Sequence, residues 1–280
     1  MCRLPKIAES TARRARDARA ALTLIELLMA VSILGIMAAA LSLLTSAVQV
    51  SSAYTEGYGT ALQHARVSLE RITRQVREAA ANENFPGTAV FYDTVQSWRF
   101  PDTLVVWHPT TAPANPAGLP LYGELVTFCP DPNTPNQLLE ITRPGDTRVA
   151  PAQTDAAGWQ NLLALIKGTD TANHRVTLTG LLRVASVDGS SATSGLRGCV
   201  RFELVMHPTA AEWASYRAGT LAWQDIDWPQ GIYGQQTGLS QSWVRMELQL
   251  VPDGSSPSGT SAQQVVPFFG SAALYFTLNQ

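Results

Sequence analysis

The sequence has few charged residues and few cysteines. Charged side chains make up 15% of its 280 residues, whereas about a quarter is usual in a soluble domain. The formal net charge of −2 provides no basic surface for nucleic acid, so we expect no nucleic-acid partner. Three cysteines exclude a disulfide-dense scaffold and a cysteine-rich zinc module. A hydrophobic content of 45% is ample for a core and excludes disorder of the whole chain.

The motifs of common enzymes are also missing. The sequence contains no G-x-S-x-G, no Gly-rich phosphate loop and no H-E-x-x-H. Asp225 and Asp227 resemble half of a calcium loop, but the third oxygen donor and the distal acid are lacking, so a turn between tryptophans is expected there. The histidines are scattered, which argues against a metal site built on them; they are His64, His108, His174 and His207. We therefore expect neither an enzyme nor a bound cofactor or metal.

The charges that are present are unevenly placed. Residues 1–21 have a net charge of +4, so the remaining residues sum to −6. From Leu22 to Val50 the only charged residue is Glu26, and this stretch exceeds the roughly 20 apolar residues that a membrane-spanning helix needs. A basic segment before an apolar one predicts that the N-terminus stays in the cytoplasm and that the bulk of the chain lies outside it.

Three interpretations of the apolar segment compete. A secretory signal peptide could be cut near Ala38–Ala40, but the apolar run continues past this site and contains Glu26. A plain membrane anchor leaves Glu26 unexplained, since charge inside a membrane is costly and is by default functional. The third interpretation is cleavage after Ala21. The new α-ammonium would then lie about one helical turn from Glu26, or Glu26 would pair with the N-terminus of a neighbouring subunit and set the stagger between subunits.

Residues 21–28, Ala-Leu-Thr-Leu-Ile-Glu-Leu-Leu, resemble the prepilin-peptidase site of type IV pilins and type II secretion pseudopilins. In that family a basic leader ends in Gly before Phe-Thr-Leu-Ile-Glu-Leu; here Ala21 and Leu22 replace the usual Gly and Phe. The resemblance implies cleavage between Ala21 and Leu22, N-methylation of Leu22 and an assembly role for Glu26. It also implies three partners: prepilin peptidase, the other pseudopilins of a hetero-oligomeric filament or tip complex, and the inner membrane.

Residues 51–85 are expected to continue the helix. Apolar residues recur at helical spacing; they are Leu62, Ala65, Leu69, Ile72, Val76 and Ala79. No proline interrupts residues 22–85, so one helix to about Ala81 is predicted, with a bend or local melting at 51–60, where glycines gather. The Arg-rich run on the opposite face ends in Arg-Glu-Ala at 77–79 and is similar to the post-membrane helix of J-type and W-type minor pilin-like proteins.

Residues 86–280 are expected to form one β-rich domain. The fold class is therefore α+β: a long N-terminal helix packed on a β-rich domain with one or two short helices. Helices are predicted at 155–167 and 211–218, and strands at 88–92, 97–100, 103–108, 123–129, 138–142, 199–206, 244–250 and 264–278. Cys129 and Cys199 remain after cleavage, and alternation places both on the less apolar face of their strands. A disulfide between them and two free thiols stay open as alternatives.

The resemblance implies a non-enzymatic structural subunit. It is most similar to the J-type minor pseudopilin of a type II secretion pseudopilus, which supports protein export. The implied location is the inner membrane, with a single pass and the C-terminal domain in the periplasm or outside the cell. A type IV minor pilin or a competence pseudopilin is an alternative within the same class. From a different class comes a membrane-anchored or secreted binding or enzymatic domain with an ordinary signal.

Overall fold

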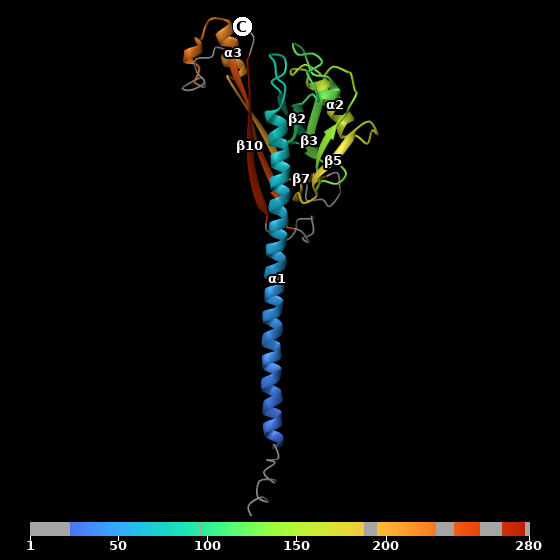
Figure 1. The fold of residues 1–280 in the computed structure, drawn as a ribbon, viewed down its shortest axis with the longest axis vertical. Helices are drawn as coiled ribbons and strands as arrows, with labels where there is room; N and C mark the ends of the chain where they lie inside the picture. The colour runs from blue at the N-terminus through green and yellow to red at the C-terminus, as the bar shows by residue number, and fades with distance from the viewer. Residues whose placement is uncertain (1–22, 96, 188–194, 228–237, 253–264, 278–280) are drawn as a thin grey trace, which may run out of the picture. The chain divides into compact units, whose positions relative to one another are not determined.

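The computed structural model describes residues 23–95, 97–187, 195–227, 238–252 and 265–277. It has the predicted α+β class, with a long N-terminal helix, α1 (Leu24–Arg77), and a β-rich domain with few short helices (Figure 1). The chain divides into two compact units, Met1–Tyr54 and Thr55–Gln280. We call them the N-terminal unit and the outer unit, and α1 contributes residues to both.

Large apolar side chains surround the N-terminal half of α1. Between Leu24 and Val50 every one of them is at least 56% exposed. The hydroxyl of Thr45 donates to the carbonyl of Leu41, four residues back, at 2.8 Å, so it is satisfied without water. Within the described residues, α1 is the helix that is long and apolar enough to cross a membrane. An apolar surface on all sides of a helix is typical of a segment that contacts lipid or other apolar helices.

In the outer unit one face of α1 is buried. Its buried residues are Gly57, Ala61, Ala65, Ser68, Ile72, Gln75 and Val76. The predicted stripe is therefore partly wrong: Leu62 is 47% exposed, whereas Ser68 is fully buried and donates its hydroxyl to the Leu178 carbonyl at 3.4 Å. Small and polar side chains on this face allow the helix to pack closely against the rest of the outer unit. A search for recurring apolar residues does not identify such a face.

Helix α1 is unbroken through residues 51–60, so the predicted local melting is wrong. Gly57 is buried, and tertiary packing at that residue compensates for the roughly 1 kcal/mol that a glycine costs inside a helix. The low helix propensity of this stretch is thus overridden by its surroundings.

The C-terminal end of α1 comes earlier than predicted, at Arg77 rather than near Ala81. The backbone N–H of Ala80 donates to the carbonyl of Trp107, at the end of a strand, at 2.8 Å. The side-chain amide of Asn82 donates to the carbonyls of two loop residues, Pro116 and Gly118, at 2.9 and 2.7 Å. The backbone N–H of Asn82 donates to the Phe85 carbonyl at 2.9 Å, so the backbone N–H groups of Ala80 and Asn82 both have partners outside the helix.

The larger sheet is antiparallel and has five strands in the order β1–β2–β3–β4–β5. The strands are β1 (Thr88–Val95), β2 (Trp98–Trp107), β3 (Leu125–Pro130), β4 (Leu138–Thr142) and β5 (His174–Thr179), with a short helical turn, η1 (Tyr122–Glu124), before β3. The predicted strands 97–100 and 103–108 are one strand, because Pro101 lies where β2 shifts register against β1, opposite Tyr92. A bulge accommodates a residue without an N–H. Strand β5 was not predicted, although Val176 and Leu178 alternate with polar residues; the alternation is short, and three of its six residues are exposed.

The smaller sheets belong to the C-terminal part of the chain. One has the order β10–β9–β8, with β8 (Val200–His207), β9 (Leu239–Leu250) and β10 (Val266–Thr277), and a short pair joins β6 (Val184–Ser186) to β7 (Leu196–Gly198). The predicted strands 199–206, 244–250 and 264–278 are confirmed within the described residues. The helices are α2 (Ala156–Lys167) and α3 (Ala210–Arg217), both predicted, and a turn, η3 (Trp223–Asp225), follows α3.

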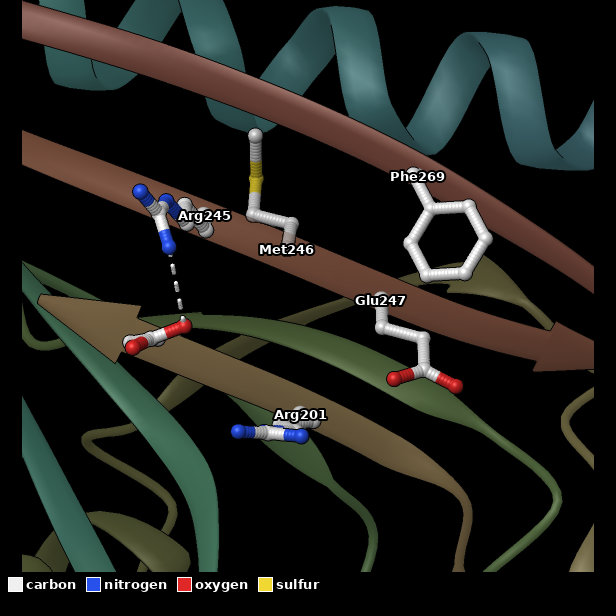
Figure 2. Close-up of a pocket in the computed structure, with 6 residues that line it drawn as sticks. Arg201, Arg245, Met246, Glu247 and Phe269 are labelled. Carbon is white, nitrogen blue, oxygen red and sulfur yellow. Dashed lines mark ion pairs between the residues drawn. The ribbon is translucent and has the colours of Figure 1, made fainter.

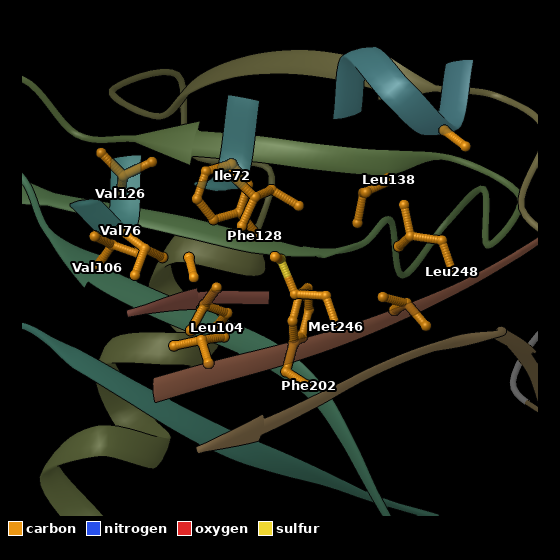
Figure 3. Packing of buried hydrophobic residues seen from close by; sticks show 14 of the residues in the cluster. Ile72, Val76, Leu104, Val106, Val126, Phe128, Leu138, Phe202, Met246 and Leu248 are labelled. Atoms are coloured by element: carbon orange, nitrogen blue, oxygen red, sulfur yellow. The ribbon is translucent and has the colours of Figure 1, made fainter. Parts of the chain in front are cut away.

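Two hydrophobic clusters hold the outer unit together. The first joins Ile72 and Val76 of α1 to both main sheets, through residues such as Phe128 of β3 and Met246 of β9 (Figure 3). The second lies on the other face of the five-stranded sheet, beneath α2, and includes Trp159 of that helix. The five-stranded sheet is therefore covered on both faces, by α1 and the three-stranded sheet on one side and by α2 on the other.

Cys129 and Cys199 are free thiols in the structure. Cys129 belongs to the second hydrophobic cluster and is fully buried, so its predicted place on a less apolar face is wrong. Every residue of β3 is buried, and a strand that is covered on both faces has no polar face. Burial raises the pKa of the Cys129 thiol to about 12 and also raises the pKa of Cys199.

Candidate functional site

Thr23 and Glu26 bind each other at the start of α1. The backbone N–H and the hydroxyl of Thr23 donate to Oε2 of Glu26 at 2.9 and 3.0 Å. In return the backbone N–H of Glu26 donates to the Thr23 hydroxyl oxygen at 3.3 Å. This reciprocal pair is a capping box. Thr23 was not among the predicted site residues, and its Thr-x-x-Glu spacing is the sequence signal that identifies it.

The capping box suits surroundings without water. The first N–H groups of a helix have no partner within the helix, and the interior of a membrane offers them none. The Glu26 carboxylate also lies at the positive end of the helix dipole, which favours negative charge. Within the described residues its hydrogen bonds go to Oε2, so Oε1 is left for a donor from outside.

The predicted cleavage site lies next to this capping box. Ala21, Leu22 and the leader lie outside the described residues. Thr23 directly follows Leu22 in the chain, and it is the residue that holds Glu26. A chain that begins at Leu22 would therefore carry its α-ammonium one residue from the group that binds Glu26.

A hollow of about 160 Å³ lies on the three-stranded sheet (Figure 2). Its charged residues face one another across β8 and β9: Arg201 is opposite Glu247, and Glu203 is opposite Arg245. Nη1 of Arg245 lies 3.7 Å from Oε2 of Glu203. Since the charges compensate in pairs, we assign them to cross-strand stabilisation of the sheet. Phe269 of β10 borders the hollow and is 71% exposed.

The described residues contain no group of three or more His, Cys, Asp or Glu that could hold a metal ion. A turn is present at Asp225, as predicted: it is η3, in which the backbone N–H of Asp225 donates to the Ala222 carbonyl at 3.0 Å. Trp228, the second tryptophan of the predicted turn, lies outside the described residues. Trp223, in the same turn, is 8% exposed and forms part of an aromatic cluster with Trp213 and Tyr216 of α3.

Comparison with known proteins identifies the N-terminal segment. The family model of the prokaryotic N-terminal methylation motif matches residues 16–42, a stretch that includes Ala21, Leu22 and Glu26. No curated protein and no solved structure matches the chain. The motif implies processing by a prepilin peptidase and assembly with other pilins, and together with the apolar α1 it fits a single-pass inner-membrane anchor. It therefore supports a type IV pilin-like or pseudopilin protein.

Proposed function

We propose that this protein is a minor pseudopilin, a structural subunit of a type II secretion pseudopilus that supports protein export. Prepilin peptidase cuts between Ala21 and Leu22, and Leu22 is then N-methylated. The observation that supports this most directly is the position of Glu26. It is the only charged residue of an apolar helical segment, and Thr23 holds it at the helix start. A type IV minor pilin or competence pseudopilin would use the same residues.

Glu26 supplies the charge that sets the stagger of neighbouring helices. Its Oε2 atom is occupied by Thr23, and Oε1 accepts from the α-ammonium of Leu22 or of a neighbouring subunit. In an apolar environment two opposite charges neutralise each other only in one relative position, so the pair determines register. The large apolar side chains around the rest of the segment then pack against lipid and partner helices.

The orientation follows from the charges. The leader has a net charge of +4, and positive charge before a spanning segment keeps that end in the cytoplasm. The outer unit would then lie in the periplasm, in reach of the other pseudopilins. The J-type subunit is the proposed equivalent because of the Arg-rich helix run that ends at residues 77–79.

The test separates the charge of Glu26 from its capping role. Glu26→Gln keeps an oxygen that can accept from Thr23 but removes the negative charge, whereas Glu26→Ala removes both. Export and cross-linking to the other pseudopilins should fall by roughly tenfold or more in both variants, at unchanged protein level and helix content for Glu26→Gln. Glu70→Ala, which removes an exposed carboxylate from the outer part of α1, is the control and should assemble normally. Normal assembly of Glu26→Gln would refute the charge-pairing role.

A further inference from the structure

A groove of about 390 Å³ runs between β1 and α2 in the outer unit. Its volume falls in the usual range of ligand sites. It is lined by Phe91, Tyr92, Thr94, Arg99, Gln153, Ala156, Trp159, Gln160 and Leu163. These residues play no part in the N-terminal segment, so the groove is independent of the proposed assembly function.

The helix side of the groove is one stripe of α2. Ala156, Gln160 and Leu163 line it at spacings of four and three residues, which places them on one helix face. From Ala156 to Leu163 the stripe is about 10 Å long. An extended chain advances about 3.3 Å per residue, so the groove accommodates roughly three to four residues of a peptide.

The floor is aromatic and rigid. Trp159 is 1% exposed, and its indole N–H donates to the Ala152 carbonyl at 3.0 Å. The Trp159 and Phe91 rings lie 4.5 Å apart between centroids, and Phe85 stacks on Trp159 at 6.0 Å. A preformed apolar floor binds an apolar side chain without having to become ordered first.

The strand side provides main-chain groups. Strand β1 is the edge of the five-stranded sheet, and within the described residues it pairs with β2 alone. An edge strand beside a helix is the arrangement in which an extended peptide adds to a sheet: the main chain gives affinity, and alternate side chains enter the groove. Gln153 and Gln160, both exposed at the opposite rim, can donate to and accept from a peptide backbone.

The charge of the groove determines what the peptide carries. Among the described residues that line it, Arg99 is the charged one, and its guanidinium lies over the Tyr92 ring at 4.5 Å from the centroid. Arg99 is exposed, so it can bind a carboxylate while it remains stacked on the ring. Residues i and i+2 of an extended chain point to the same side.

We propose that this groove binds an extended segment of a partner protein in which an acidic residue is followed, two positions later, by a large apolar residue. The carboxylate pairs with Arg99, the apolar side chain covers the half-buried Phe91 ring, which Trp159 supports from beneath, and the peptide backbone pairs along β1.

The test uses the full chain in detergent micelles and two capped, fluorescein-labelled peptides, Ala-Glu-Ala-Phe-Ala and Ala-Gln-Ala-Phe-Ala. Binding is measured by fluorescence anisotropy, and empty micelles are the control. The Glu peptide should bind about three- to fivefold more tightly than the Gln peptide, the effect of an exposed ion pair. Arg99→Gln should remove that difference, while Arg217→Gln on α3, also an exposed arginine, should keep it.

A second pair of variants tests the location. Ala156→Trp fills the groove and should weaken both peptides by roughly tenfold or more. Ala157→Trp, on the adjacent exposed position that does not line the groove, should leave binding unchanged. Two results would overturn the proposal: equal binding of the Glu and Gln peptides, or absence of saturable peptide binding up to about 1 mM.

Discussion

At the scale of single residues, the buried carboxylate of Glu140 connects α1 to the five-stranded sheet. It accepts two hydrogen bonds from Arg71 of α1, at 2.8 Å from Nε and 2.7 Å from Nη2. The two side chains differ in exposure, 7% for Glu140 and 37% for Arg71. The cost of breaking the pair therefore depends on which partner is removed, because only Arg71 can turn to water.

We expect Arg71→Met to destabilise the outer unit more than Glu140→Gln. Arg71→Met leaves a buried carboxylate without its cation and should cost roughly 2 kcal/mol, less than the roughly 3–5 kcal/mol of a fully buried pair. Glu140→Gln should cost about 1 kcal/mol, since the amide can still accept from Arg71. Denaturant unfolding followed by near-UV circular dichroism measures both. Equal losses would contradict the difference in exposure.

Two aspartates should give the outer unit opposite responses to pH. Hydrogen bonds from Arg148, with a further one from Arg143 at 2.7 Å, lower the pKa of Asp146. Burial raises the pKa of Asp102, although Lys167 and Thr103 lie close to it. The stability that Asp146 contributes is present above its unfolded pKa of about 3.9 and is lost as the pH falls through its folded pKa. The penalty from Asp102 is absent below about pH 3.9 and grows as the pH rises.

We therefore expect Asp146→Asn to lower Tm at pH 7 and to differ less and less from the parent protein below about pH 4. Asp102→Asn should keep or raise Tm at pH 7, and its advantage should disappear on acidification. Thermal unfolding of the parent and both variants from pH 3 to 7 checks the signs. Parallel curves for the two variants would contradict the opposite pKa directions.

At the scale of elements, tertiary packing decides where α1 continues and where it ends. The helix passes through the glycine-rich stretch at 51–60 and stops at Arg77. A chain reversal follows at Gly87, which has a φ of +79°. A Cβ there would overlap with Leu274 and lie 2.8 Å from the Ala80 carbonyl, whereas a Cβ at Gly59 would have nothing within 4 Å.

Gly59→Ala and Gly87→Ala should consequently change stability in opposite directions. Alanine at the helical Gly59 should stabilise by about 0.5–1 kcal/mol, because it restricts the unfolded chain and fits the helix. Alanine at Gly87 should destabilise by more than that, since it is strained by the positive φ and by the close neighbours. The free energies of unfolding of the two variants, compared with the parent, provide the measurement. Stabilisation by both would show that Gly87 does not need its conformation.

The elements that were predictable are those whose side chains alternate between core and solvent. In β9 every second residue is buried along the whole strand, and α2 begins after Asp155, whose side chain caps it by accepting from the Gly158 N–H at 2.9 Å. The burial of Cys129 could not be predicted from alternation, because strand β3 is buried on both faces. The groove beside α2 could not be predicted, since it brings together β1 and a helix more than sixty residues later in the chain.

The capping box of Thr23 and Glu26 is a local feature, so the Thr-x-x-Glu spacing in the sequence is enough to identify it. The proposed cleavage and methylation would also involve neighbouring residues, which lie between Ala21 and Glu26. The buried stripe of α1 was less predictable: the polar residues Ser68 and Gln75 are buried, whereas the apolar Leu62 is half exposed. Which face of a helix is buried depends on the shape of the sheet it meets, and that shape is set by residues far away in the sequence.

At the scale of the whole molecule, the two units have different surfaces. The N-terminal unit presents apolar side chains throughout its described length, and the outer unit buries two hydrophobic clusters. The charges follow the same division: the N-terminal unit has a net charge of +3, which is +4 from residues 1–21 and −1 from Glu26, so the outer unit has −5. A chain of this kind is suited to be held in a membrane by one end and to present a folded domain at the other.

The measurement that tests this account most directly is the intact mass and N-terminal sequence of the protein isolated from membranes, with and without prepilin peptidase. The account predicts a chain that begins at N-methylated Leu22, and a chain that retains residues 1–21 when the peptidase is absent. A chain that begins after Ala40, or one that keeps Met1 in the presence of the peptidase, would contradict it.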